Sequence, residues 1–268
     1  MWIDTHCHLD ASEFGGASLA MADQAAQAGV SGIVVPAVHV NNFEAVIELS
    51  RQRPACYFAL GIHPMYVPTS KESDLQVLRE KIASLMGQGN ASSRLVAIGE
   101  IGLDYFVPAL TQSPLREKQE FFYTEQLKIA RDFGLPVLLH VRRSQDIILK
   151  HLRRIEVVGG IAHAFNGSQQ QAQHFIKLGF KLGFGGAMTF SRALQIRRLA
   201  TELPLESIVL ETDAPDIAPS WIADGVNAPS QLPQIGTVLA ELRGLSLAQT
   251  AAATTANALA VMPGMHCG

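Results

Sequence analysis

Short apolar runs rich in β-branched residues alternate with longer amphipathic stretches along all 268 residues of the chain. Such alternation is typical of repeated βα units, which form a parallel sheet covered by helices. We predict eight strands, at residues 2–6, 32–37, 57–61, 95–100, 136–140, 160–163, 180–184 and 207–211. Eight strands close a TIM (β/α)8 barrel, which usually takes about 250 residues. A doubly wound open sheet is the structural alternative, although no Gly-rich dinucleotide loop follows the first predicted strand.

Residues that favour helix ends accompany this pattern. Ser113 offers an N-cap, and Pro114 offers a first helical residue, for a long helix that ends at Gly134. Ser246 and, three residues later, Gln249 form a capping box that opens the last helix. These signals place helices between and after the predicted strands, as the α/β interpretation requires.

The composition indicates an ordered globular protein, because 48% of the residues are hydrophobic and only 17% are charged. Residues 87–93 and 215–229 are predicted to form loops, and neither has the length of an interdomain linker. We therefore expect one domain that spans residues 1–268.

The sequence also limits where the protein acts and what it binds. No apolar run is long enough to cross a bilayer, and the first residues lack the basic and apolar regions of a secretory signal. Three scattered cysteines favour a reducing compartment over a disulfide framework. The formal net charge of −3 excludes a broadly basic nucleic-acid surface. We expect a cytoplasmic protein without membrane association and without an obligate protein partner.

Two histidines near the start of the chain, His6 and His8, are separated by one residue. If residues 2–9 form a strand, both imidazoles project to the same side and can bind one metal ion. Cys7 then points to the other face, where packing in the core is the expected role. Two unrelated histidines at a polar terminus are the alternative interpretation.

Further polar residues close other predicted strands, and the carboxyl ends of all strands of a barrel converge on one face. Together they give six candidate metal ligands: His6, His8, Glu100, His140, His163 and Asp213. Six N/O ligands exceed what one tetrahedral zinc takes and suit two divalent ions that share a bridging carboxylate. Glu100 is the natural bridge, because it lies between the first pair and the later histidines in strand order. Any one of these residues alone is equally compatible with an ordinary loop position.

Several ordered motifs resemble those of the TatD family, which comprises metal-dependent deoxyribonucleases of the amidohydrolase-like superfamily. The resemblance runs over essentially the whole chain. Its motifs are Asp4-Thr5-His6-Cys7-His8, Gly61-Ile62-His63-Pro64, Gly99-Glu100-Ile101-Gly102-Leu103-Asp104-Tyr105, His140-Val141-Arg142, His163-Ala164-Phe165-Asn166-Gly167 and Glu211-Thr212-Asp213-Ala214-Pro215. The chain departs from the family at Ala164 and Asn166, which puts substrate contacts near the sixth strand in doubt but removes no ligand.

The resemblance implies a TIM barrel, a two-metal site and hydrolysis of phosphodiester bonds. It carries metal binding to the six residues above and assigns contact with the substrate phosphate to His63. Asp104 and Arg142 are further candidates for substrate binding: Asp104 would orient a ligand or His63, and Arg142 would bind a phosphate through its guanidinium group. Each is equally compatible with an ordinary ion pair.

The hypothesis is that two divalent ions, Zn, Mg or Mn, polarise a phosphate and lower the pKa of a water molecule. Asp213 and Glu100 are the candidate catalytic residues, and Asp213 takes the proton of the water. An acidic chain favours short or single-stranded nucleic acid ends as substrate. An ester, lactone, amide or aminoacyl-tRNA ester on the same barrel is the alternative, and a metal-binding protein without turnover is a third interpretation.

Overall fold

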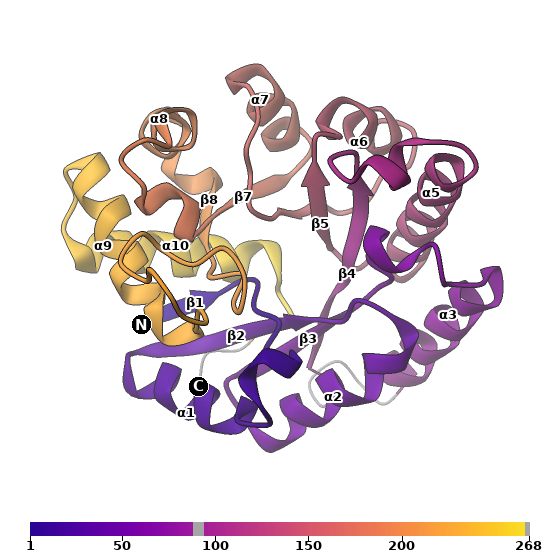
Figure 1. Cartoon of the computed structure of the whole chain (residues 1–268), viewed down its shortest axis with the longest axis horizontal. Coiled ribbons are helices and arrows are strands. Elements are labelled where there is room, and N and C mark those ends of the chain that lie inside the picture. The colour runs from indigo at the N-terminus through magenta and orange to yellow at the C-terminus, as the bar shows by residue number, and fades with distance from the viewer. Residues whose placement is uncertain (88–93, 266–268) are drawn as a thin grey trace.

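The computed structural model describes residues 1–87 and 94–265, in which eight parallel strands follow one another in sequence order around a nearly closed barrel (Figure 1). This arrangement confirms the predicted TIM barrel and excludes the doubly wound sheet. The strands are β1 (Trp2–Asp4), β2 (Val30–Pro36), β3 (Cys56–Leu60), β4 (Leu95–Asp104), β5 (Val137–Arg142), β6 (Gly160–Ala162), β7 (Phe180–Phe184) and β8 (Ile208–Leu210).

Helices surround the strands, and short 3-10 helices lie in the connections (Figure 1). The α-helices are α1 (Ser18–Gln27), α2 (Phe43–Gln52), α3 (Glu72–Gly87), α5 (Leu115–Phe133), α6 (Gln145–Leu152), α7 (Gln169–Lys177), α8 (Leu194–Glu202), α9 (Leu232–Arg243) and α10 (Leu247–Val261). The 3-10 helices are η1 (Ser12–Phe14), η2 (Val40–Asn42), η3 (Pro64–Tyr66), η4 (Pro108–Thr111), η5 (Gly186–Thr189), η6 (Leu205–Ser207) and η7 (Pro229–Gln231). In the described ranges, no helix is long and apolar enough to span a bilayer.

The predicted helix ends are confirmed in part. Ser246 caps α10 through a capping box with Gln249, and α5 ends at Gly134, whose φ of 63° is the left-handed conformation that glycine adopts freely. The start of α5 was predicted wrongly, because Pro114 itself occupies the N-cap position and Ser113 lies outside the helix.

The two predicted loops have different outcomes. Residues 215–228 contain no helix or strand, as predicted, and η7 begins at Pro229. In the other predicted loop, Gly87 belongs to the end of α3, and residues 88–93 lie outside the described residues.

Contacts between the first and last strands complete the barrel. The amide of Thr5 donates to the carbonyl of Leu210 at 3.1 Å, and the amide of Asp213 donates to the carbonyl of His6 at 2.8 Å. The buried carboxylate of Asp4 accepts hydrogen bonds from both the amide and the hydroxyl of Thr212, at 3.0 and 2.6 Å. These bonds hold two segments together that are about two hundred residues apart in sequence.

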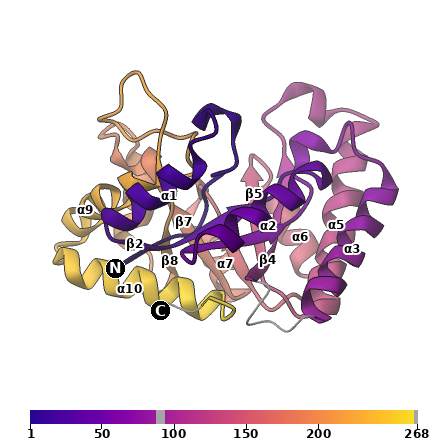
Figure 2. The same ribbon diagram turned by 90° about the horizontal axis from the view of Figure 1, so that it is seen from below.

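The apolar core has two layers, because strands of a parallel barrel are buried on both faces. The larger cluster lies between the strands and the helices. The smaller one fills the inside of the barrel and continues onto α10, as its members show: Ile3, Val34, Tyr57, Ala59, Val96, Ala97, Leu138, Ile161, Val209, Ala258, Met262 and Met265. Figure 2 shows α10, in yellow, along one end of the barrel, whereas the loops after β1 and before α9 rise at the other end.

Strand β4 differs from its prediction in a way that matters for the site. It continues past residue 100 to Asp104, and its pairing with β5 shifts between Ile98 and Ile101. Three residues of β4 are thereby matched to two of β5, which is the signature of a bulge. Glu100 therefore lies at an irregularity within the strand and not at its end. His140 likewise lies within β5, two residues before Arg142.

Candidate metal centre

His6 and His8 follow β1, which ends at Asp4, two residues before the predicted end of this strand, so the condition that residues 2–9 form one strand is not met. The regular pairing stops there because the chain bonds to both neighbours in turn: the amide of Thr5 bonds to β8, and the amide of Cys7 bonds to Val34 of β2. The two imidazoles nevertheless converge, with their Nε2 atoms 3.3 Å apart. Cys7 is fully buried in the core, as expected.

Glu100 lies at the centre of the cluster, and its two carboxylate oxygens face different histidines. Oε2 is 3.1 Å from Nε2 of His6 and 3.3 Å from Nε2 of His8. Oε1 is 2.9 Å from both Nδ1 of His140 and Nε2 of His163. The side chain is almost completely buried. A carboxylate between two pairs of imidazoles has the position that a bridging ligand requires.

The sixth candidate ligand, Asp213, joins the same cluster. Its Oδ1 lies 3.6 Å from Nε2 of His6 and 3.8 Å from Nε2 of His8. Its backbone adopts a φ of 55°, an uncommon left-handed conformation for a residue with a side chain, and its amide is held by the carbonyl of His6. The structure thus brings together all six residues that the sequence singled out.

The donor set fits divalent cations. Three groups of side chains each place three ligand atoms within 4.8 Å of one another: His6, His8 and Glu100; His6, His163 and Asp213; and His63, Glu100 and His140. Buried Nδ1 atoms of His6 and His163 have no hydrogen-bond partner among the described residues. Imidazole nitrogens with carboxylate oxygens are the ligands that zinc, manganese and iron share.

Burial and charge determine the protonation of these groups. Burial lowers the pKa of His6 to about 3, so this ring is neutral and ready to bind a cation. Burial also opposes charge on His8 and His163, but Glu100 outweighs it and raises their pKa to about 9 and about 10. Burial opposes the charge of Glu100, but the surrounding histidines His63, His163, His6 and His140 hold its pKa well below its usual range. Metal binding at His8 and His163 therefore releases protons.

Asp104 lies behind the cluster. Its Oδ2 accepts from Nε2 of His140 at 3.1 Å, and its Oδ1 accepts from the amides of Phe106 and Val107. Because the carboxylate is buried and both oxygens are occupied, its position is that of a group that orients His140, not His63. Arg142 is half-exposed, with Nη1 3.8 Å from Oδ2 of Asp104.

His63 extends into the cluster from the loop after β3. Its Nε2 lies 3.0 Å from Nδ1 of His140 and 3.4 Å from Oε1 of Glu100. Its Nδ1 accepts a hydrogen bond from the amide of Met65. Burial lowers the pKa of His63 to about 4, so the ring is neutral at pH 7. A neutral ring that accepts at Nδ1 carries its proton on Nε2, and that proton points into the site.

Sequence reasoning missed Glu211, which supports His163. Its Oε1 accepts from the amide of Ala164 and lies 3.8 Å from Nδ1 of His163. Burial raises the pKa of Glu211 to about 8. The signal was present in the sequence, because an acidic residue at the end of an apolar strand and two residues before a candidate ligand needs a buried partner.

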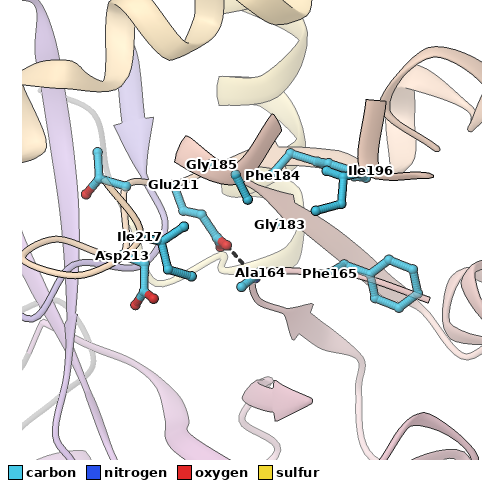
Figure 3. A pocket seen from close by; sticks show the side chains of 11 residues that line it. Ala164, Phe165, Gly183, Phe184, Gly185, Ile196, Glu211, Asp213 and Ile217 are labelled. Carbon is cyan, nitrogen blue, oxygen red and sulfur yellow. Dashed lines mark hydrogen bonds between the residues drawn. The ribbon is translucent and has the colours of Figure 1, made fainter. Parts of the chain in front are cut away.

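A small cavity of about 20 Å³ lies beside Glu211 and Asp213 (Figure 3). Phe165, Phe184 and Ile217 contribute apolar walls, and the space has room for one water-sized molecule. Figure 3 shows Glu211 extending toward Ala164. A Cβ atom on Gly183 would meet Oε2 of Glu211 at 2.1 Å, so only glycine leaves room for this carboxylate.

Comparison with known proteins identifies the class and then the family. The family model described as TatD related DNase matches residues 3–263. Together with the barrel and its histidine and carboxylate cluster, this match defines a metal-dependent hydrolase. The chain belongs to the TatD family.

Relatives and solved structures agree with this assignment. The chain is 40% identical over 243 residues to the uncharacterized metal-dependent hydrolase YjjV of Escherichia coli, with 90% of each chain covered. The crystal structure of YjjV superposes with a TM-score of 0.90 at 38% identity and covers 98% of both chains. The chain is also 29% identical over 262 residues to human deoxyribonuclease TATDN3, with 97% of this chain and 94% of the relative covered. These matches confirm the resemblance that the motifs indicated.

Proposed function

We propose that this hydrolase cleaves phosphodiester bonds at short or single-stranded nucleic acid ends, with two divalent ions in the cluster around Glu100. The observation that carries the proposal is the carboxylate of Glu100, whose two oxygens face separate pairs of histidines. His6 and His8 would hold one ion with Glu100, and His140 and His163 would hold the other. Asp213 would complete the ligand set. Bound divalent ions supply Lewis acidity toward a phosphoryl oxygen and a lowered pKa for water.

His63 has a role distinct from that of the metal ligands. Since the amide of Met65 occupies its Nδ1, its Nε2 is a hydrogen-bond donor and lacks the lone pair that a ligand needs. Such a donor suits a non-bridging oxygen of a phosphate beside Glu100. Loss of one preorganised donor of this kind typically lowers kcat by about 10²–10³-fold.

Asp213 is the candidate general base. Burial raises the pKa of its carboxyl group, which increases its affinity for a proton from the attacking water. Asp213 lies at the edge of the cluster, 3.6 Å from the nearest ring nitrogen of His6, so it retains freedom to accept that proton. The proton can then pass to the leaving oxygen.

The human relative carries the name deoxyribonuclease, which supports nucleic acid as the substrate class. The net charge of −3 supports a short substrate, because a long duplex requires many cationic contacts to its phosphates. Ester or amide hydrolysis on the same barrel is the competing function, and its substrates belong in the same assay.

The test is a reconstitution experiment. Metal-free protein receives Mg²⁺, Mn²⁺, Zn²⁺ or Co²⁺ separately and is assayed on a single-stranded oligonucleotide, an aminoacyl ester and a lactone. We expect metal-stimulated oligonucleotide cleavage, a loss of about 10²–10⁴-fold in kcat for Asp213→Asn, and little change for the exposed Asp132→Asn. Equal cleavage by the Asp213→Asn preparation would reveal a contaminating nuclease, and turnover of esters alone would overturn the proposal.

A further inference from the structure

An exposed aromatic ring lies beside two arginines at the mouth of the barrel. Phe106 is 44% exposed, and it follows the end of β4 by two residues. The guanidinium carbon of Arg142 lies 3.8 Å from the centre of its ring, and that of Arg143 lies 4.7 Å from it. A single exposed ring is ordinary on a protein surface, but the two guanidinium groups that lie over it distinguish Phe106 from an exposed ring such as Phe121.

The position of this group ties it to the candidate metal centre. Asp104 accepts at Oδ1 from the amide of Phe106, at 2.8 Å, and at Oδ2 from Nε2 of His140, at 3.1 Å. One carboxylate therefore holds both the backbone that carries the aromatic ring and a candidate metal ligand. A substrate whose phosphate lies at the cluster would extend its neighbouring nucleotide along this side of the mouth.

The positive charges of Arg142 and Arg143, beside Phe106, are available to bind a ligand. Within the residues that the structure describes, Arg143 forms no ion pair, and Arg142 approaches only Asp104, at 3.8 Å. Arg79 provides a contrast on the outer helices, since it lies over Phe133 but its charge is paired with Asp132 at 2.6 Å.

The backbone conformation of Arg143 gives an independent indication that a ligand binds here. Arg143 has a φ of 56°, in the left-handed region that glycine occupies without cost and other residues rarely adopt. Residues held in such conformations concentrate at ligand sites, where the surrounding structure compensates for the strain. This backbone conformation places the guanidinium group of Arg143 against the exposed ring of Phe106.

We propose that Phe106, Arg142 and Arg143 form a nucleotide subsite: the flat ring and guanidinium groups stack against a base, and the arginines bind the adjoining phosphate. The proposal rests on the proposed function and adds how the substrate is held. Stacking on aromatic rings or guanidinium planes is the usual way in which unpaired bases are bound, and it tolerates any base sequence. The subsite therefore predicts a preference for unpaired ends and no strong sequence preference.

The first experiment compares an oligonucleotide with a matched one that is abasic at its terminal positions. Phe106→Leu keeps an apolar side chain but removes the flat ring. We expect it to raise KM for the normal oligonucleotide about tenfold, within the range that stacking of one base provides, and to leave KM for the abasic one unchanged. Phe121→Leu, at an exposed ring on the outer face of α5, is the matched control and should change neither. An equal effect of Phe106→Leu on both oligonucleotides, or no effect, would overturn the subsite.

Equilibrium binding separates this proposal from the proposed function. Fluorescence anisotropy with both oligonucleotides on the Asp213→Asn background needs no turnover, so the subsite is tested even if phosphodiester cleavage fails. Phe106→Leu should again weaken binding of the normal oligonucleotide alone.

A second variant tests the arginine without risk to folding. Arg143→Gly suits the left-handed backbone, and we expect it to weaken binding of the normal oligonucleotide and to lower the slope of log affinity against log salt by about one. An unchanged slope would exclude the phosphate contact.

Discussion

Asp104 accepts a hydrogen bond at 3.1 Å from Nε2 of His140, and this contact determines which nitrogen of the ring faces Glu100. With its Nε2 proton held by Asp104, His140 directs Nδ1 toward Oε1 of Glu100 at 2.9 Å, and a cation bound there would take the place of the proton on Nδ1. Of the two orienting roles that the sequence suggested for Asp104, toward a ligand or toward His63, the structure places it against the candidate ligand His140.

Asp104→Asn should weaken metal binding without removing a ligand. The amide retains an oxygen for the backbone of Phe106 and Val107 but no longer attracts the proton of His140. We expect about 10–100-fold lower metal affinity, as is typical when the partner of a ligating histidine is lost. Calorimetric titration of the metal-free protein measures this, with Asp132→Asn as the surface control. Unchanged affinity would show that His140 needs no orienting partner.

Metal binding should stabilise the fold in a defined stoichiometry. At a free metal concentration of 100 times the Kd, we expect a gain of about 2.7 kcal/mol per bound ion, or about 5.4 kcal/mol for two ions, which raises Tm by roughly 10–20 °C in a chain of this size. Elemental analysis of the loaded protein should give two ions per chain. Glu100→Ala removes the shared carboxylate and should abolish most of the Tm gain. A stoichiometry of one would contradict the bridging role of Glu100.

The buried Glu211 makes the stability of the metal-free protein depend on pH. Its pKa rises from 4.5 in the unfolded chain to about 8 in the fold, so between these values the native state binds a proton that the unfolded state releases. Stability from this group is therefore fully present below about pH 4.5 and is lost as the pH rises through 8.

Glu211→Gln, which mimics the neutral form, should leave Tm nearly unchanged at pH 4.5 and raise it at pH 8. The expected rise is at least about 3 °C, which corresponds to roughly 1 kcal/mol in a domain of this size. Differential scanning calorimetry at both pH values checks this prediction, and the exposed Glu48→Gln should show no such difference. A variant that is equally destabilised at both pH values would assign Glu211 a purely structural role.

Thr212 should be important for closing the barrel. Thr212→Val preserves the shape of the side chain but removes the 2.6 Å hydrogen bond to Asp4 between the first and last strands. Leaving a buried carboxylate with one partner fewer costs about 1–3 kcal/mol. Urea unfolding of the metal-free protein measures this loss. Thr201→Val, whose exposed hydroxyl bonds only to its own helix, should cost less than about 0.5 kcal/mol.

The strand pattern could be predicted from sequence because each barrel strand is buried on both faces and appears as an apolar run. All eight strands lie at the predicted apolar runs. Because side chains alternate between the two faces of a strand, every second residue of a run points into the barrel, where these side chains form the inner apolar layer. Leu138 belongs to that inner layer, and His140, two residues later, points the same way toward the site.

The bulge in β4 was beyond sequence reasoning. Ile98 and Ile101 both pack in the outer layer although they are three residues apart, which strict alternation forbids. The extra residue turns Glu100 inward, because a bulge redirects the side chains that follow it. Glu100 therefore lies in the histidine cluster, as predicted, but with a local geometry that differs from the predicted strand end.

The end of β1 and the role of Glu211 could not be predicted, because each depends on contacts between residues that are far apart in the sequence. The end of β1 depends on hydrogen bonds that Thr5 and Cys7 make to opposite neighbours, and these partners are remote in sequence. Glu211 was overlooked because its function lies in a contact with His163, and no local pattern reports which buried acid meets which ring.

Helix α10 covers one end of the barrel and packs against the side chains that fill it, so the barrel can be approached from the other end only. A polymeric substrate of the proposed kind could therefore not pass through the barrel. It would have to reach the cluster, and its products would have to leave, on the open side alone.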